Sequence, residues 1–138
     1  MCIRDRMRSM IEVYRDLMKK YFGIEPQIKS KFQLQTIEWS YYGQYSGGAR
    51  FYVVFPVKKG ERIMVEIRKN AAIRARLKKM LREWERAIIN RDFDNYRWLL
   101  ISIFEMSLAN AVNIFRERMD GDTLVRERIS GKLPSARS

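Results

Sequence analysis

Residues 51–67 read FYVVFPVKKGERIMVEI, and this stretch decides the fold. Apolar side chains occupy every second position before and after a short polar turn: Phe51, Val53, Phe55, Val57, Ile63, Val65 and Ile67. A period of two is typical of a strand with one buried face, and a turn containing Gly60 between two such runs indicates a hairpin. Pro56 cannot donate to a ladder, so we expect its strand to lie at an edge or its amide position to point outward.

The residues before the hairpin predict one more strand and one helix. Residues 32–41 alternate between apolar and polar positions, and a phase change near Thr36 indicates a bulge. From about residue 7 to residue 22 the apolar residues follow a 3, 1, 3, 1, 3 spacing, which places them on one face of a helix. Gly23 and Pro26 end that helix.

Two further helices are predicted after the hairpin. Residues 70–90 carry one apolar stripe, and residues 93–119 carry a broader one that begins at Asp92 or Asp94 as N-cap and ends before Gly121. We expect this third helix to be the most buried element. The residues expected to face helix two and the sheet are Leu99, Ile103, Phe104, Leu108, Val112 and Phe115.

These elements predict an α+β fold in the order αβββαα: an N-terminal helix, a three-stranded antiparallel sheet, and an antiparallel two-helix hairpin packed on one sheet face. One domain is expected over residues 7–122, followed by a basic flexible tail over 123–138. Residues 1–6, MCIRDR, look like translated adapter sequence at the end of an assembled metagenomic fragment. We therefore interpret them as a non-native leader.

The composition excludes several kinds of chemistry. There is no histidine and Cys2 is the single cysteine, which rules out Cys/His zinc sites, Ser-His or Cys-His catalysis, and disulfides within the chain. Asp92 with Asp94, and Asp120 with Asp122, could hold Mg²⁺, but helix capping explains both pairs more simply. We expect no catalytic residues, no metal site and no cofactor.

The net charge of +12 is the strongest functional signal. A field of this sign attracts polyanions, chiefly nucleic acid or anionic lipid. Within the helix predicted over 70–90, four cations spaced by four residues form one ridge, and four more surround its N-terminal half. The ridge is Arg74, Lys78, Arg82 and Arg86, and the flanking residues are Arg68, Lys69, Arg76 and Lys79.

Like charges four residues apart on a helix repel each other by a few tenths of a kcal/mol. A helix shaped for stability alone would alternate the signs, so the ridge indicates a partner. The sequence therefore predicts a non-enzymatic module that grips the phosphates of DNA or RNA with little sequence readout. The alternative is a merely solvated, solubilising face.

A second candidate surface combines aromatic and basic residues near the hairpin: Tyr45, Arg50, Tyr52, Lys58 and Lys59. Planar rings can stack on bases while flanking cations hold phosphates. The alternative is that these tyrosines are ordinary strand residues, several of which face the core.

The order helix, three strands, helix loosely resembles the double-stranded-RNA-binding domain over about residues 10–81. Gly23 to Pro26 and the basic start of helix two fall in comparable places. The chain departs from that family in lacking a histidine after the glycines, in having Asn70 after Lys69 where a second lysine is expected, and in adding a long third helix. We interpret the likeness as one of topology alone.

A different function class is a structural or partner-binding subunit of a viral or multi-protein assembly. The third helix would then pack against a second copy or another chain. Polar residues interrupt its apolar run, so we expect no membrane span, and binding to an anionic membrane surface is a third alternative. The chain shows no signal peptide and no disulfide framework, so we expect it to be cytoplasmic.

Overall fold

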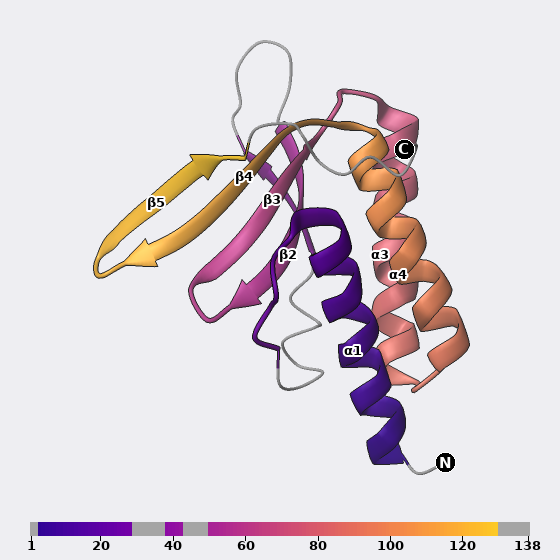
Figure 1. Cartoon of the computed structure of the whole chain (residues 1–138). Coiled ribbons are helices and arrows are strands. Elements are labelled where there is room, and N and C mark those ends of the chain that lie inside the picture. Colours follow the sequence, from indigo (N-terminus) through magenta and orange to yellow (C-terminus); the bar gives the residue numbers. More distant parts are fainter. Residues whose placement is uncertain (1–2, 29–37, 43–49, 130–138) are drawn as a thin grey trace.

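A computed structural model describes residues 3–28, 38–42 and 50–129 of the chain. The elements in order are α1 (Ile3–Phe22), β1 (Glu38–Tyr42), β2 (Arg50–Lys58), β3 (Glu61–Ile67), α3 (Ala71–Ile89), α4 (Phe93–Ala109), β4 (Ala111–Asp120) and β5 (Thr123–Arg128). The strands form one antiparallel sheet in the order β1-β2-β3-β4-β5 (Figure 1). The predicted three-stranded αβββαα fold is therefore wrong, because strands follow the helical hairpin α3–α4 and complete the sheet.

The error lies in the second half of the predicted third helix. α4 ends at Ala109, and the C-cap Asn110 donates from its side-chain amide to the carbonyl oxygen of Met106 at 2.8 Å. The chain then runs as β4 antiparallel to β3, with Ile114 opposite Val65. The apolar spacing here fits a helix as well as a strand, but β3 offers an edge whose backbone groups need partners. Long-range pairing therefore decides the conformation.

The segment 123–128, expected as part of a flexible tail, forms the edge strand β5. Asp120 pairs with Thr123 across a two-residue turn, and Gly121 in that turn has φ of 64°. Positive φ at the first turn position is the geometry for which glycine is favoured in tight hairpins. Asp120 is therefore the last residue before a hairpin turn and Asp122 lies in that turn, so neither is at a helix end. Residues 130–138 of the expected tail lie outside the described residues.

The hairpin β2–β3 is confirmed, with a register shift between Pro56 and Lys58 beside the turn at Gly60. An edge position for this strand was one of the two expectations from Pro56, but β2 lies inside the sheet. The described part of β1 pairs with residues 50–54 of β2, so Pro56 lies beyond that pairing, where its missing backbone N–H breaks no bond to β1. The first two predicted helices are also confirmed, and the bulge expected near Thr36 falls outside the described residues.

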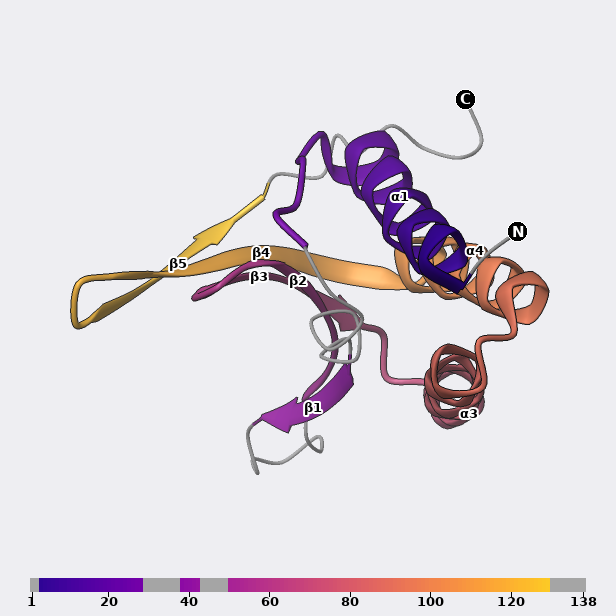
Figure 2. The ribbon, with the colours of Figure 1, turned by 90° about the horizontal axis from the view of Figure 1, so that it is seen from below.

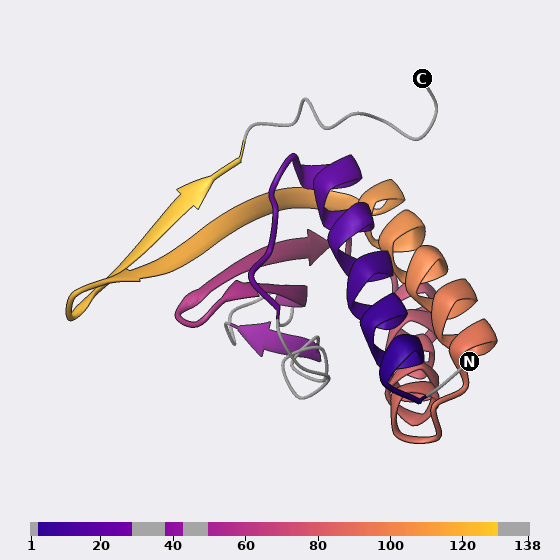
Figure 3. The same cartoon turned by 60° about the horizontal axis from the view of Figure 1, so that its bottom comes forward.

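All three described helices cover one face of a curved sheet (Figure 2). α4 lies between α1 and α3, and the three helices are seen side by side in Figure 3. The phenol of Tyr96 on α4 donates to the carbonyl of Met10 at 2.7 Å, and Tyr14 on α1 donates to the carbonyl of Pro56. Burial raises the pKa of both phenols well above the ordinary value. These neutral donors fix α1 to α4 and to β2.

The core contains most of the residues predicted for it, with two exceptions. Leu99, Ile103 and Phe104 are buried among the three helices and the sheet. Val112 is half exposed, and Phe115 packs on the opposite sheet face. Phe115 follows the core residue Ile114 on β4, and a strand sends successive side chains to opposite faces. Val112 lies at a register shift, between the residues opposite Ile67 and Glu66, and has no partner on β3. In the described part of the chain, no helix is long and apolar enough to cross a membrane.

Candidate nucleic-acid interface

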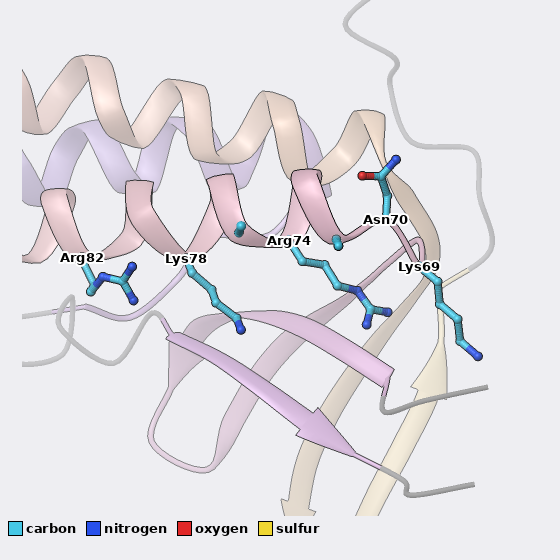
Figure 4. A pocket seen from close by; sticks show the side chains of 7 residues that line it. Lys69, Asn70, Arg74, Lys78 and Arg82 are labelled. Atoms are coloured by element: carbon cyan, nitrogen blue, oxygen red, sulfur yellow. The ribbon is translucent and has the colours of Figure 1, made fainter. Parts of the chain in front are cut away.

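A groove runs along the flank of α3 that faces β1 and β2. Its volume is about 480 Å³, and it is lined by Lys69, Asn70, Ala71, Arg74, Ala75, Lys78 and Arg82. The side chains of Arg74, Lys78 and Arg82 all extend from α3 toward the strands (Figure 4). Among the described residues that line this groove there is no carboxylate. The described lining of the groove therefore carries charge of a single sign.

Local sequence explains why α3 presents this row. Asn70 caps the helix, and its side-chain oxygen accepts from the backbone N–H of Ile73 at 3.1 Å. The buried stripe, which includes Leu77, Leu81 and Trp84, turns toward the core. Positions 74, 78 and 82 stand to one side of that stripe, so the cations reach the sheet flank rather than the outer surface.

Arg74 is held in place by the end of β3. Its guanidinium donates to the carbonyl oxygens of Ile67 and Arg68, each at 3.3 Å. The guanidinium carbon also lies 5.6 Å from the ring centroid of Phe51, and the ammonium of Lys78 lies 5.8 Å from the same centroid. The ring of buried Phe51 therefore attracts both cations through its π face and helps to hold them along this flank of α3.

The remaining residue of the ridge, Arg86, and three of the flanking cations do not line the groove. Arg76 and Lys79 are exposed and do not line the groove, whereas Arg86 lines a neighbouring hollow between α3 and α4. Arg68 is exposed at the junction of β3 and α3, where its carbonyl accepts from Arg74. The structure therefore brings four predicted residues together in one groove: Lys69, Arg74, Lys78 and Arg82.

Lys58 and Lys59 do not belong to this groove. They sit at the β2–β3 turn, the end of the sheet remote from α3 (Figure 2). There they line a separate hollow with the buried carboxylates Glu61 and Glu117, and the ammonium of Lys58 lies 3.8 Å from a Glu61 oxygen. Because a buried carboxylate lies next to Lys58, this hollow does not suit a phosphate group.

The second candidate surface is dispersed. Arg50 and Tyr52 alternate with Phe51 along β2, so they lie on the sheet face opposite the groove. Tyr52 is only 1% exposed and packs with Val54 and Met64, so it cannot stack on a base. Tyr45 lies outside the described residues.

Several arginines of the sheet pair with carboxylates on adjacent strands. Arg62 and Arg126 both contact Glu117 at 2.8 Å, and Arg116 pairs with Glu61. Across the residues that the structure places, no group of three potential metal ligands comes together. In the described lining of the α3 groove, by comparison, every charged residue is a cation.

Sequence reasoning missed two parts of the groove. Asn70 was noted only as the helix start, yet it lines the groove beside Lys69. Phe51 was assigned to the core, where it is buried, but its ring also supports Arg74 and Lys78. The spacing of the cations was visible in the sequence, whereas the strand lying beneath them was not.

Comparisons of the chain with protein-family models, with curated proteins and with solved structures give no match. The functional argument therefore depends on the geometry of the groove itself.

Proposed function

We propose that the chain is a non-enzymatic nucleic-acid-binding module that grips the phosphate backbone in the α3 groove. The observation that carries this proposal is the clustering of Lys69, Arg74, Lys78 and Arg82 around one groove with no carboxylate among its described lining residues. Guanidinium and ammonium groups are the side chains that hold phosphates. Contacts of this kind do not read base edges, so binding depends little on sequence.

The salt dependence of binding follows from the number of cations. Each neutralised phosphate contributes a slope of about −0.9 on duplex DNA, or about −0.7 on a single strand, to the logarithm of affinity against the logarithm of salt. Four contacts on a single strand give a slope near −2.8, which is a loss of roughly 50-fold between about 50 and 200 mM salt. A partner held by apolar contacts would not show this dependence.

The test is a charge reversal inside the groove. The double variant Lys78→Glu, Arg82→Glu should weaken binding to labelled DNA and RNA by more than about tenfold and make the salt slope shallower by about 1.4 or more, because two contacts are lost. Arg74 is kept because it donates to β3 carbonyls and its replacement would disturb the fold. Fluorescence anisotropy over a salt series measures both quantities.

The matched control is Arg76→Glu, Lys79→Glu. It changes the net charge by the same amount on the same helix, but both residues lie outside the groove lining. The control should lose less affinity and keep most of the salt slope. Equal losses in the two variants would show that overall charge, and not the groove, attracts the nucleic acid.

The alternative function, in which a partner or second copy docks on the predicted third helix, finds little exposed apolar surface on α4. Leu99, Leu100, Ile103 and Phe104 of α4 are buried in the core of the same chain, and Trp98 is the one strongly exposed large apolar residue of this helix. The four buried residues are not exposed to a second copy while the chain is folded. The groove is therefore the better-supported basis for a function.

A further inference from the structure

Trp98 is exposed on α4 without an evident structural role. Its exposed fraction is 65%, the highest among the large apolar side chains of the described segments. Trp84, by contrast, is buried against Tyr96. The side chain of Trp39 lies outside the described residues. An indole that stays largely exposed contributes little burial to folding, so the position of Trp98 invites a functional explanation.

Trp98 lines a hollow of about 330 Å³ between the C-terminal half of α3 and the start of α4. The other lining residues are Glu83, Arg86, Ala87, Asn90, Asp92, Asn95 and Leu99. Asp92 is engaged as the N-cap of α4 and accepts from the backbone and the side-chain amide of Asn95. Amides, one guanidinium and two carboxylates form a mixed polar rim, which suits the donor and acceptor edges of a base better than it suits phosphates.

The hollow continues the row of cations that starts in the groove. On a helix with 3.6 residues per turn, each step of four residues advances about 6 Å and rotates about 40° around the axis. From Arg74 to Arg86 the row therefore rotates by about 120°, from the sheet flank across the outer surface to the α4 flank. Arg82 lines the groove and Arg86 lines the hollow, so they connect the two sites.

The exposed indole of Trp98 at the end of this path selects the kind of nucleic acid. A duplex keeps its bases paired and stacked inside, so it offers no free base face to the indole. A single strand can follow the row, and its unpaired bases have free faces to stack on an indole.

The geometry points to a single-stranded nucleic acid as the ligand, with its phosphates along Arg74, Lys78, Arg82 and Arg86 and one base stacked on Trp98. This inference rests on the proposed function and adds the strand type and a base-contacting residue. Stacking is insensitive to base identity, because every base offers an aromatic face. The same site therefore accepts single-stranded DNA or RNA.

The test compares Trp98→Leu with the wild-type chain on labelled oligothymidylate, oligouridylate and a duplex of equal length. The leucine variant should bind both single strands roughly 5- to 150-fold more weakly, as expected for one lost stacked base. Its salt slope on single strands should stay the same, because the phosphate contacts remain. Trp98→Phe should retain most of the affinity, since a planar ring is restored.

The control is Leu124→Ala on the β4–β5 hairpin, which truncates another exposed apolar side chain away from α3. It should bind like the wild-type chain, and thermal unfolding of every variant should match because both sites are exposed.

The outcomes separate the two claims. Salt-dependent binding by the wild type that is unchanged in Trp98→Leu would overturn this inference and leave the proposed function standing. Equal losses on single strands and duplex would overturn the assignment of strand type. A wild-type chain that binds none of the three probes would overturn the proposed function and this inference together.

Discussion

Glu117 shows how one buried carboxylate organises three strands. It is 3% exposed, and it accepts from Arg62 on β3 and from Arg126 on β5. Burial alone would raise the pKa of its carboxyl, but the hydrogen bonds and charges of Arg126 and Arg62 outweigh it and hold that pKa below the ordinary value. The charged form is therefore favoured in the folded chain.

We predict that part of the stability of the chain is lost in acid because of Glu117. Its pKa is lower in the folded than in the unfolded chain, so its contribution is complete above the ordinary glutamate value of about 4.3 and falls as the pH drops through the folded pKa. Glu117→Gln should lower the free energy of unfolding at pH 7 by about 1–2 kcal/mol and flatten its acid dependence. Urea unfolding between neutral and acid pH measures both effects.

The matched control is Glu127→Gln. The side chain of Glu127 is 56% exposed, and its pair with Arg118 is open to solvent, so its removal should change the free energy of unfolding by less than about 1 kcal/mol. A variant Glu117→Gln that unfolds like the wild type at pH 7 would contradict the role assigned to the buried carboxylate.

Single residues could be predicted from sequence where a local rule applies. Four-residue spacing correctly placed Arg74, Lys78 and Arg82 on one side of a helix. Tyr52 was misjudged as a surface residue although its alternation with Phe51 already assigns the two to opposite faces. That rule could not tell which face is covered, because the packing on the far face depends on strand partners elsewhere in the chain.

At the scale of elements, caps and turns were informative. Asn70 and Asp92 begin α3 and α4 as N-caps, as their side-chain chemistry predicts. Gly121 was interpreted as the residue after a helix end, although Gly121-Asp122, with glycine first, is also a two-residue hairpin signal. A helix end at Asn110 and a strand after it are also favoured by the β-branched residues Val112 and Ile114. The predicted third helix extends wrongly past Ala109 because the apolar residues of β4 fit the helical period as well as the strand period.

We predict that Gly121→Ala destabilises the β4–β5 hairpin. Gly121 has φ of 64°, a conformation that costs an L-residue about 1–2 kcal/mol. No heavy atom lies within 4 Å of an added Cβ, so the loss is conformational rather than a clash. Faster hydrogen exchange of β5 amides, with a smaller change in α3, is the expected result.

Asp122→Ala is the control for this prediction. It alters the neighbouring turn residue, which does not have a positive φ in the described backbone. Its β5 amides should exchange nearly as in the wild type. Equal protection in both variants and the wild type would show that Gly121 does not limit the hairpin.

The topology of the whole molecule was beyond sequence reasoning. β3 pairs with β2 across a short turn, which is a local relationship, but its other partner β4 begins only after two helices. The backbone bond from the N–H of Arg68 to the carbonyl of Asn110, at 2.9 Å, closes this insertion at its base. Hydrophobic period describes which face a residue occupies, not which distant strand lies beside it.

We predict that a chain ending at residue 122 folds cooperatively, whereas one ending at residue 109 does not. The shorter chain lacks β4, which buries Ile114 in the core and pairs along β3. The longer chain loses the largely exposed edge strand β5, the contact of Arg126 with Glu117, and the half-buried Ile129, but it keeps β4 and its pairing with β3. Urea unfolding followed by circular dichroism should show a transition for the longer chain alone, and a cooperative transition in both would contradict the prediction.

Because α3 and α4 lie between β3 and β4 in the chain, β3 is synthesised well before its partner β4. Ile67 pairs with Ala111, so roughly 40 residues must be translated before the two strands can meet. At about 5–20 residues per second, this takes about 2 to 8 seconds. During that interval the nascent chain carries a formed hairpin with an open strand edge, which neighbouring nascent chains on the same messenger could join. The protein therefore depends on its ribosome-bound surroundings most strongly while its helices are being made.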